Sequence, residues 1–493
     1  MILIFGYECA KVCNIKPQGQ EVWDMTIKIN SKRGVLFCVF IFLALTGCAL
    51  LKHSTEEPDF QSTHMPNVIL VTLDAVRADH LGCYGYERHT SPRIDEFAEN
   101  GTLYTKSFAA APWTIPTHAS LFTGKYPFEH GAHTFKVEEW GNNVNSLHER
   151  HLTLAEVFKE EGYDTAAFVA NAAYLSTRWQ LNQGFDTYHV ERVYALKLNE
   201  QVFKWLDTHT DNSFFLFINY IDVHGPFNTT PRPGLLDEPV VEDDLKLGRR
   251  LYKKVMPGEG PIPGDLVRKW INQYDTAVAN LDEQVGALLD RLIDTNLYDD
   301  TIIVLTSDHG DFFGEHYLIG HSKDLYQEVL WVPLIIKNYR QKGRRITDVL
   351  TSSTDIPNLI FSQFPHDVAE QYAAVFSDAP GNHLAISENY YTRTRDLFNL
   401  RWGKRFNRVR TAVFDWPYKY IRSSDGKHEL YHLVDDPKES NNLIEYEAEI
   451  ADRLVKKLER FQKNRGESTD EIDLRPLTEE NRKKLKSLGY IGD

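Results

Sequence analysis

The feature that most constrains the fold is a set of short, uninterrupted apolar runs separated by helical patterns. The runs cover residues 68–73, 214–221, 302–306, 332–336 and, more weakly, 165–169. Continuous rather than alternating apolar residues are typical of strands buried on both faces of a parallel sheet. Between them, apolar residues recur at steps of three and four over residues 274–292, which predicts an amphipathic helix. We therefore expect an α/β fold with a doubly wound, mostly parallel sheet flanked by helices.

Three of these runs are followed at once, or after one serine, by an acidic residue, and these residues are Asp74, Asp222 and Asp308. In open α/β sheets, ligands bind beyond the carboxyl ends of the strands, where such residues would meet. A helix N-cap or a turn is an equally simple explanation for any single one of them. The three together predict one shared site at that edge of the sheet.

The length of 493 residues exceeds what one hydrophobic core normally supports, so we expect a large domain and at least one smaller unit. Short strands separated by turns replace the earlier pattern after about residue 365. We predict a catalytic domain at 66–365, a small C-terminal α+β subdomain with an antiparallel sheet at 366–446, and a charged helical tail at 447–493. A net charge of −15 argues against a broad nucleic-acid-binding surface.

The N-terminus has the pattern of a targeting segment. Residues 35–45 are uncharged and apolar, follow basic residues, and are too few to span a bilayer. The run ends in Leu-Thr-Gly-Cys at Cys48, which resembles the processing box of bacterial lipoproteins. We expect a signal peptide at 1–47 (with Met25 as a hypothetical true start), a tether at 48–65, and a lipid on Cys48. This would anchor the protein in a membrane of the cell envelope, on the non-cytoplasmic side (periplasm or cell surface).

Four segments carry residues suited to chemistry. They contain Asp74 and Arg77; Thr114 and His118; Asp222 and His224; and Asp308, His309, His321 and Lys323. Asp together with His is a common ligand pair for Zn, Mn and related cations. A hydroxyl and a His ahead of a predicted helix suit an anion, which helix N-termini favour. A lone His is more often structural, but the four clusters together predict a metal-assisted hydrolase.

Several motifs resemble those of the sulfatase family, within the alkaline phosphatase superfamily. They include Arg77-Ala-Asp-His-Leu-Gly-Cys-Tyr-Gly85, Ser307-Asp308-His309-Gly310, and Glu429-Leu-Tyr-His-Leu433 followed by Asp436-Pro437. The resemblance covers residues 67 to about 445. It implies a doubly wound catalytic domain, a small C-terminal sheet domain, and cleavage of sulfuric or phosphoric esters.

The resemblance also implies roles for individual residues. Asp74, Asp308 and His309, with Thr114, would hold one divalent metal ion (Ca, Mn or Zn), and Thr114 stands at the position of the nucleophile. His224 would be the general acid or a contact to a substrate oxygen. Lys323, or His321 beside it, would face the anionic group of the substrate, and we expect Arg77 to stabilise the negative charge of the same group. Asp222 with His224 could form a second metal site or only contact substrate, and the same two roles are open for His118.

Two departures from the family pattern affect the chemistry. Ala75 stands where many sulfatases have a second metal-binding Asp, which argues against their calcium site. Thr114 cannot mature to formylglycine, because its β-carbon already carries a methyl group, and His118 replaces the Arg usual nearby. A threonine phosphate, however, can be attacked by water or by an acceptor alcohol. The local chemistry therefore favours phosphoesters, although the family resemblance favours sulfate.

Three functional classes remain open from the sequence. The first is an esterase that cleaves small, glycan or lipid sulfate or phosphate esters at the cell envelope. The second is a phosphodiesterase, phosphonate hydrolase or phosphoryl transferase that acts on envelope lipids or glycans. The third is an inactive relative that only binds, which the complete set of metal ligands and the hydroxyl disfavour. The sequence leaves the oligomeric state open.

Overall fold

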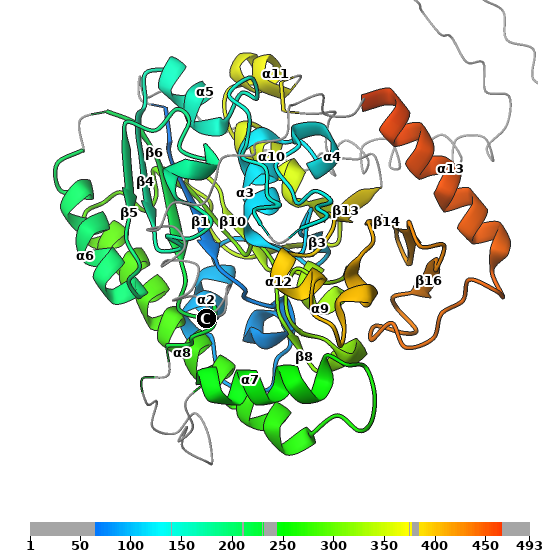
Figure 1. The fold of residues 1–493 in the computed structure, drawn as a ribbon. Coiled ribbons are helices and arrows are strands. Elements are labelled where there is room, and N and C mark those ends of the chain that lie inside the picture. Colours follow the sequence, from blue (N-terminus) through cyan, green and yellow to red (C-terminus); the bar gives the residue numbers. More distant parts are fainter. Residues whose placement is uncertain are drawn as a thin grey trace, which may run out of the picture. The chain divides into compact units, whose positions relative to one another are not determined.

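An eight-stranded sheet forms the centre of the structure, a computed structural model (Figure 1). Its strand order is β11-β2-β10-β7-β1-β6-β4-β5. The strands are β1 (Asn67–Leu73), β2 (Thr102–Tyr104), β4 (Asp164–Val169), β5 (Thr187–Val190), β6 (Phe214–Tyr220), β7 (Thr301–Thr306), β10 (Leu334–Lys337) and β11 (Arg345–Thr347). All five predicted apolar runs are strands of this sheet, and β1, β6 and β7 are almost entirely buried because helices cover both faces.

The structure describes residues 65–139, 141–209, 212–228, 230, 244–373, 375–376 and 384–465. Every described residue belongs to the unit Phe60–Asp493. The predicted signal peptide, the lipidation site Cys48 and almost all of the predicted tether lie outside the described residues. No helix in the described part of the chain is both long and apolar enough to cross a membrane.

Most neighbouring strands of the sheet are parallel, and β10 is the exception. It runs antiparallel to β7, with Leu334 opposite Thr306, and antiparallel to β2. The expectation that residues 332–336 form another parallel strand is therefore wrong. After β7 the chain stays at the carboxyl edge, where it forms loops and α9 (Gln327–Leu330), so it re-enters the sheet from that edge in the opposite direction.

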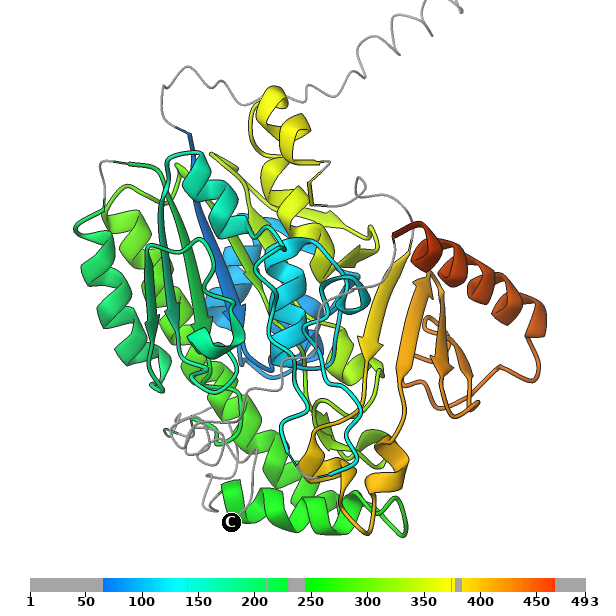
Figure 2. The same ribbon diagram turned by 45° about the horizontal axis from the view of Figure 1, so that its top comes forward.

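Helices cover both faces of the sheet, as the doubly wound prediction requires (Figures 1 and 2). One layer contains α2 (Pro92–Ala98), α6 (Ala195–Leu206) and α8 (Gly264–Asp294), and the other contains α3 (Thr114–Thr123), α5 (Leu154–Glu160) and α10 (Ile356–Phe361). Helix α8 includes the predicted helix at 274–292 and extends ten residues further towards the N-terminus.

A separate four-stranded antiparallel sheet follows in the C-terminal part, as predicted. Its strands are β13 (Ala385–Asn389), β14 (Arg410–Asp415), β15 (Tyr418–Ser423) and β16 (Glu429–His432), in that order. Helix α13 (Ala448–Arg465) crosses one face and buries Leu454 and Leu458 against it. The other face joins the main core, where Phe414 stacks on Phe108 at 4.1 Å between ring centres.

The remaining α-helices and strands complete the described part of the chain. They are α4 (Pro127–His130), α7 (Asp244–Val255), α11 (His366–Ala373), α12 (Thr394–Leu397), and two small sheets formed by β3 (Ser107–Phe108) with β12 (Thr351–Ser352) and by β8 (Phe312–Phe313) with β9 (Ile319–Gly320). The predicted helical tail is α13 up to Arg465, and residues 466–493 lie outside the described part of the chain.

Candidate metal centre and active site

The carboxyl ends of neighbouring strands bring the predicted acidic residues to one edge of the sheet. Asp74 follows β1, and Asp308 with His309 follows the adjacent strand β7. Thr114, the first residue of α3, lies against them. All four side chains are completely buried. The structure therefore brings together the four residues expected to hold a metal ion.

The ligand atoms of these residues converge. His309 Nε2 lies 3.4 Å from Asp308 Oδ2, 3.9 Å from Asp74 Oδ1 and 3.4 Å from Thr114 Oγ1. His309 Nδ1 lies 3.0 Å from the carbonyl oxygen of Gly310, which only accepts hydrogen bonds, so the lone pair of the neutral ring is on Nε2. Asp74, Asp308 and His309 thus each present one oxygen or nitrogen atom to a common point, as binding of a metal ion requires.

The two carboxylates each use one oxygen for hydrogen bonds and aim the other at this point. Asp74 Oδ2 accepts a hydrogen bond from Asn171 Nδ2 at 2.7 Å, and Asp308 Oδ1 accepts one from the backbone N–H of Ala75 at 3.2 Å. Asp74 Oδ1 and Asp308 Oδ2 have no hydrogen-bond partner among the described residues. Buried polar atoms are normally paired, so two such oxygens beside one imidazole nitrogen fit a bound cation.

Ala75 has a backbone role in this arrangement. Its φ of +66° lies in the left-handed region, which is unusual for a residue other than glycine. In this conformation its N–H donates to Asp308. Its methyl side chain offers no metal ligand.

Burial raises the pKa values of both acids, and the negative charge of Asp308 adds to the effect at Asp74. Burial is the main cause for Asp74, followed by the negative charge of Asp308, and its pKa rises to about 7. The pKa of Asp308 also rises to about 7, chiefly through burial. A divalent cation between them would reverse this effect, because it stabilises the ionised carboxylates.

A second group of possible ligands adjoins the first. It consists of His309, Asp311 and His321, all buried, with Asp311 Oδ1 2.7 Å from His321 Nδ1. The ring of His321 lies 4.2 Å from that of His309 and 5.0 Å from that of His224. Both groups include His309, whose Nε2 lone pair can bind only one ion, so they do not form two independent sites.

The structure places the two open candidates outside these clusters. Asp222 accepts hydrogen bonds at both oxygens, from the N–H of Ala195 and from Asn228 Nδ2, each at 2.9 Å. His118 lies behind Thr114: its Nδ1 is 2.8 Å from the Thr114 carbonyl oxygen, and the Thr72 hydroxyl donates to its Nε2 at 3.1 Å. Asp222 thus anchors a loop, and His118 supports the residue expected to be the nucleophile.

Two predicted cations have different surroundings. Lys323 Nζ donates to the His321 carbonyl oxygen at 2.8 Å and to the Tyr252 hydroxyl at 3.2 Å, so it lies beside the histidine cluster. Arg77 instead forms ion pairs with Asp79 at 2.7 Å and Glu315 at 2.9 Å. These carboxylates occupy the guanidinium group that we expected to face the substrate. Arg77 therefore shapes the loops next to the site.

Three residues at or beside the site were not identified from the sequence: Asn171, Asp311 and Arg393. Asn171 follows β4, so the strand-end pattern could have identified it. Asp311 follows the predicted Asp308–His309 pair by two residues. Arg393, which donates to Ser322 Oγ at 3.3 Å, lies in the C-terminal part, and no sequence pattern connects it to the site.

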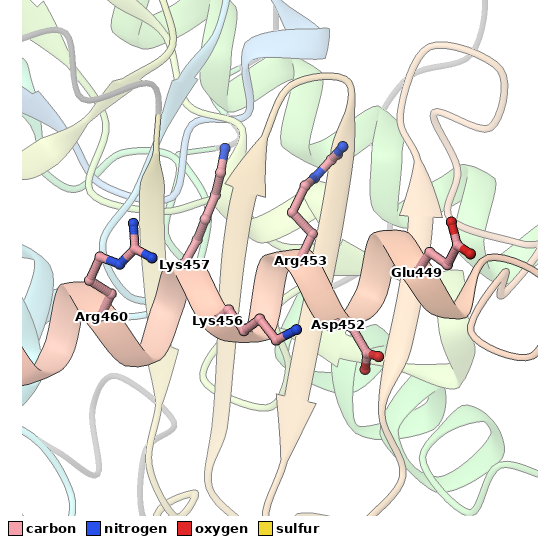
Figure 3. A pocket seen from close by; sticks show the side chains of 6 residues that line it. All are labelled: Glu449, Asp452, Arg453, Lys456, Lys457 and Arg460. Atoms are coloured by element: carbon pink, nitrogen blue, oxygen red, sulfur yellow. The ribbon is translucent and has the colours of Figure 1, made fainter.

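The surface of α13 carries a shallow hollow of about 490 Å³ (Figure 3). Its lining residues are far along the chain from those of the candidate metal centre. It is lined by Glu449, Asp452, Arg453, Lys456, Lys457 and Arg460. Asp415 pairs with Lys457 at 2.7 Å and with Arg453 at 3.8 Å. The hollow is thus an ion-paired helix face and contains none of the candidate catalytic residues.

Comparison with known proteins finds sulfatases among the relatives of this chain. The chain is 25% identical to an ulvan-active sulfatase of Formosa agariphila over 480 residues, which covers 88% of each chain. It is 24% identical to an N-acetylglucosamine-6-O-sulfatase of Bacteroides thetaiotaomicron over 549 residues, which covers 89% of this chain and 92% of the relative. The crystal structure of a phosphonate monoester hydrolase of Agrobacterium radiobacter shares the fold, with a TM-score of 0.62 and 19% identity over 82% of this chain and 97% of that chain.

The sequence model of the sulfatase family matches residues 66–366, which include β1, β7 and the candidate metal centre. The chain therefore belongs to the sulfatase family and is a hydrolase of that family.

Proposed function

We propose that the protein is a metal-dependent hydrolase that cleaves sulfuric or phosphoric esters with Thr114 as its nucleophile. The observation that carries the proposal is the convergence of two buried, unpartnered carboxylate oxygens with His309 Nε2 beside Thr114 Oγ1. Asp74, Asp308, His309 and Thr114 would hold one divalent ion (Ca, Mn or Zn). When bound, such an ion supplies positive charge that favours the ionised hydroxyl and the developing charge of the reacting group.

The proposed reaction has two displacement steps. Thr114 Oγ1 attacks the sulfur or phosphorus atom, and the bond to the leaving alkoxide breaks as the new ester bond forms. Burial is the main cause that lowers the pKa of His224 and keeps its ring neutral, so that it can take the proton from Thr114 and return it to the alkoxide. A water molecule then attacks the sulfur or phosphorus atom of the threonine ester, and the bond from that atom to Thr114 Oγ1 breaks. The sulfate or phosphate product leaves, and a proton from the water restores the Thr114 hydroxyl.

Two lines of support point to different esters. Relatives named sulfatases, such as the ulvan-active enzyme, support sulfuric esters. The chemistry of Thr114 supports phosphoric esters, because threonine cannot form the aldehyde through which sulfate is expelled. A phosphodiesterase, phosphonate hydrolase or phosphoryl transferase is therefore the second candidate. The fold of this chain is also that of two phosphonate monoester hydrolases of known structure.

The test compares T114A with T114S. We expect T114A to fold and to bind metal but to lose turnover, whereas T114S should keep the hydroxyl and measurable activity. Each protein would be assayed with an aryl sulfate, a phosphate monoester, a phosphate diester and a phosphonate monoester, with Mn, Zn or Ca added. Retained activity in T114A would exclude covalent catalysis by this residue, and the preferred ester would decide between the two candidates.

We also propose that the protein is attached to a membrane of the cell envelope through a lipid on Cys48. Support comes from the basic residues, the apolar core at 35–45 and the Leu-Thr-Gly-Cys sequence that ends at Cys48. Labelling with radioactive palmitate in a bacterial host should mark the wild type and leave C48A unlabelled. Equal labelling of both proteins would refute the assignment.

A further inference from the structure

Helix α8 places the side chain of Tyr274 beside the loop that follows β1. This side chain is fully buried, and its ring packs edge-on against that of Phe313, with 4.8 Å between the ring centres. Its hydroxyl group donates a hydrogen bond to the carbonyl oxygen of Ala75 at 2.8 Å and accepts one from the backbone N–H of Arg77, also at 2.8 Å. Both partners are backbone atoms of the loop that begins at Asp74.

This loop holds Ala75 in an unfavourable backbone conformation. Its φ of +66° lies in the left-handed region, where a Cβ atom is crowded by the neighbouring carbonyl group. Such a conformation persists only where the surrounding contacts fix it. The Tyr274 hydroxyl fixes the carbonyl end of the peptide group between Ala75 and Val76, and at the other end the N–H of Val76 donates to Ser307 Oγ at 3.0 Å.

The conformation of Ala75 in turn determines a contact of one candidate metal ligand. The N–H of Ala75 donates to Asp308 Oδ1 at 3.2 Å. The other oxygen of this carboxylate, Oδ2, lies 3.4 Å from His309 Nε2 and has no hydrogen-bond partner among the described residues. Rotation about φ of Ala75 would turn its N–H away from Asp308 and free the carboxylate to turn. Tyr274 is thus connected to the metal-facing oxygen through a single backbone residue.

We propose that Tyr274 is a positioning residue of the metal centre, because its hydroxyl group holds Ala75 in the conformation that orients Asp308. The inference rests on the proposed function for the presence of a metal ion at this centre. Groups that orient metal ligands from behind typically change metal affinity by about 10- to 100-fold when they are removed. We expect the lower end of this range, because Ser307 holds the same peptide group from its other end.

The first test compares Y274F with Y163F in the full-length protein. Y274F removes the hydroxyl group and keeps the ring. Y163F is the matched control, because Tyr163 is also buried and its hydroxyl donates to a backbone carbonyl, that of Pro66 at 3.0 Å, at the other end of β1. In calorimetric titrations with Mn, Zn and Ca, Y274F should bind the preferred ion about 10-fold more weakly than the wild type, and Y163F should match the wild type. Equal affinities of Y274F and the wild type would overturn the proposal.

A glycine at position 75 separates this role from a loss of packing. Glycine adopts positive φ without the crowding of a Cβ atom, so it depends less on the tyrosine hydroxyl. The gain in metal affinity from A75G should therefore be larger in the Y274F background than in the wild type. Equal gains in the two backgrounds would show that the hydroxyl does not act through Ala75, and would refute the proposal.

Hydrogen exchange separates failure of this proposal from failure of the proposed function. If the wild type binds none of the three ions, the proposed metal centre is wrong, but exchange of single amides in EDTA still tests Tyr274. The Arg77 amide loses its acceptor in Y274F in any case, whereas the Ala75 amide should exchange faster only if the hydroxyl holds Ala75 in place. Unchanged exchange at Ala75 would refute the proposal. If Y274F does not fold, A75G/Y274F decides: a folded double variant would support the role, and one that also fails to fold would refute it.

Discussion

Replacing Asp308 by Asn should change stability in opposite directions with and without metal. In the metal-free protein, the Asp308 carboxyl has a pKa of about 7, against an ordinary value of 3.8. The unfolded chain therefore releases this proton at a lower pH than the folded protein does. Stability of the metal-free protein falls as pH rises from about 4 to about 7, and above that range the loss is complete.

The size of the effect follows from the shift. Each pH unit over which only the unfolded state has lost the proton costs about 1.4 kcal/mol. Between about pH 5 and pH 7.5 this condition holds over roughly two pH units, so the free energy of unfolding should fall by about 3 kcal/mol. D308N has no proton to lose at this position, and it also removes the negative charge that raises the pKa of Asp74.

The assay is urea unfolding followed by tryptophan fluorescence, with EDTA or with saturating metal, at about pH 5 and pH 7.5. In EDTA, we expect D308N to be more stable than the wild type by a few kcal/mol at the higher pH, with a smaller difference at the lower pH. With metal, the order should reverse, because the wild type gains binding energy that the amide cannot supply. If D308N in EDTA were less stable than the wild type at both pH values, the two-carboxylate reasoning would be wrong.

Two further substitutions test the support of the site and of the C-terminal sheet. N171A removes the amide that fixes Asp74 at 2.7 Å, so metal affinity measured by calorimetry should fall about 10-fold or more, while unchanged affinity would show that this contact is dispensable. K419M leaves Glu439 buried without the ammonium group that lies 2.7 Å away, and should reduce the free energy of unfolding by about 3–5 kcal/mol. The double variant K419M/E439Q should recover most of that loss in urea unfolding. If its stability did not recover, the loss would come from changed packing and not from the unpaired charge of Glu439.

The strand-end acids show how far local pattern was informative. Asp74 and Asp308 follow buried apolar runs, and the structure places them on the adjacent strands β1 and β7. Asp222 follows an equally clear run on the other neighbour of β1, yet both of its oxygens are occupied by loop hydrogen bonds. The same sequence pattern therefore placed all three residues at one edge but could not tell a metal-facing carboxylate from a loop anchor.

The arginines Arg77 and Arg393 show that closeness to a motif in the sequence does not predict the contacts of a side chain. Arg77 belongs to a motif next to Asp74, yet Asp79 and Glu315 occupy its guanidinium group. Arg393 belongs to no motif, yet it contacts Tyr174 and Ser322, and Ser322 lies between His321 and Lys323. A side chain's neighbours depend on how loops from distant segments pack, and no spacing along the chain records this.

The sequence by itself determined the α/β class and the residues that end the buried strands, because burial and hydrogen bonding impose these patterns within a few residues. The place of Thr114 beside those residues was implied by the family resemblance and not by a local pattern. The tertiary structure decided the direction of β10, the pairing of Asn171 with Asp74, and the contacts of Arg393 with Tyr174 and Ser322. These features join segments up to 219 residues apart. Such contacts arise from the folding of the whole chain, so a local pattern cannot contain them.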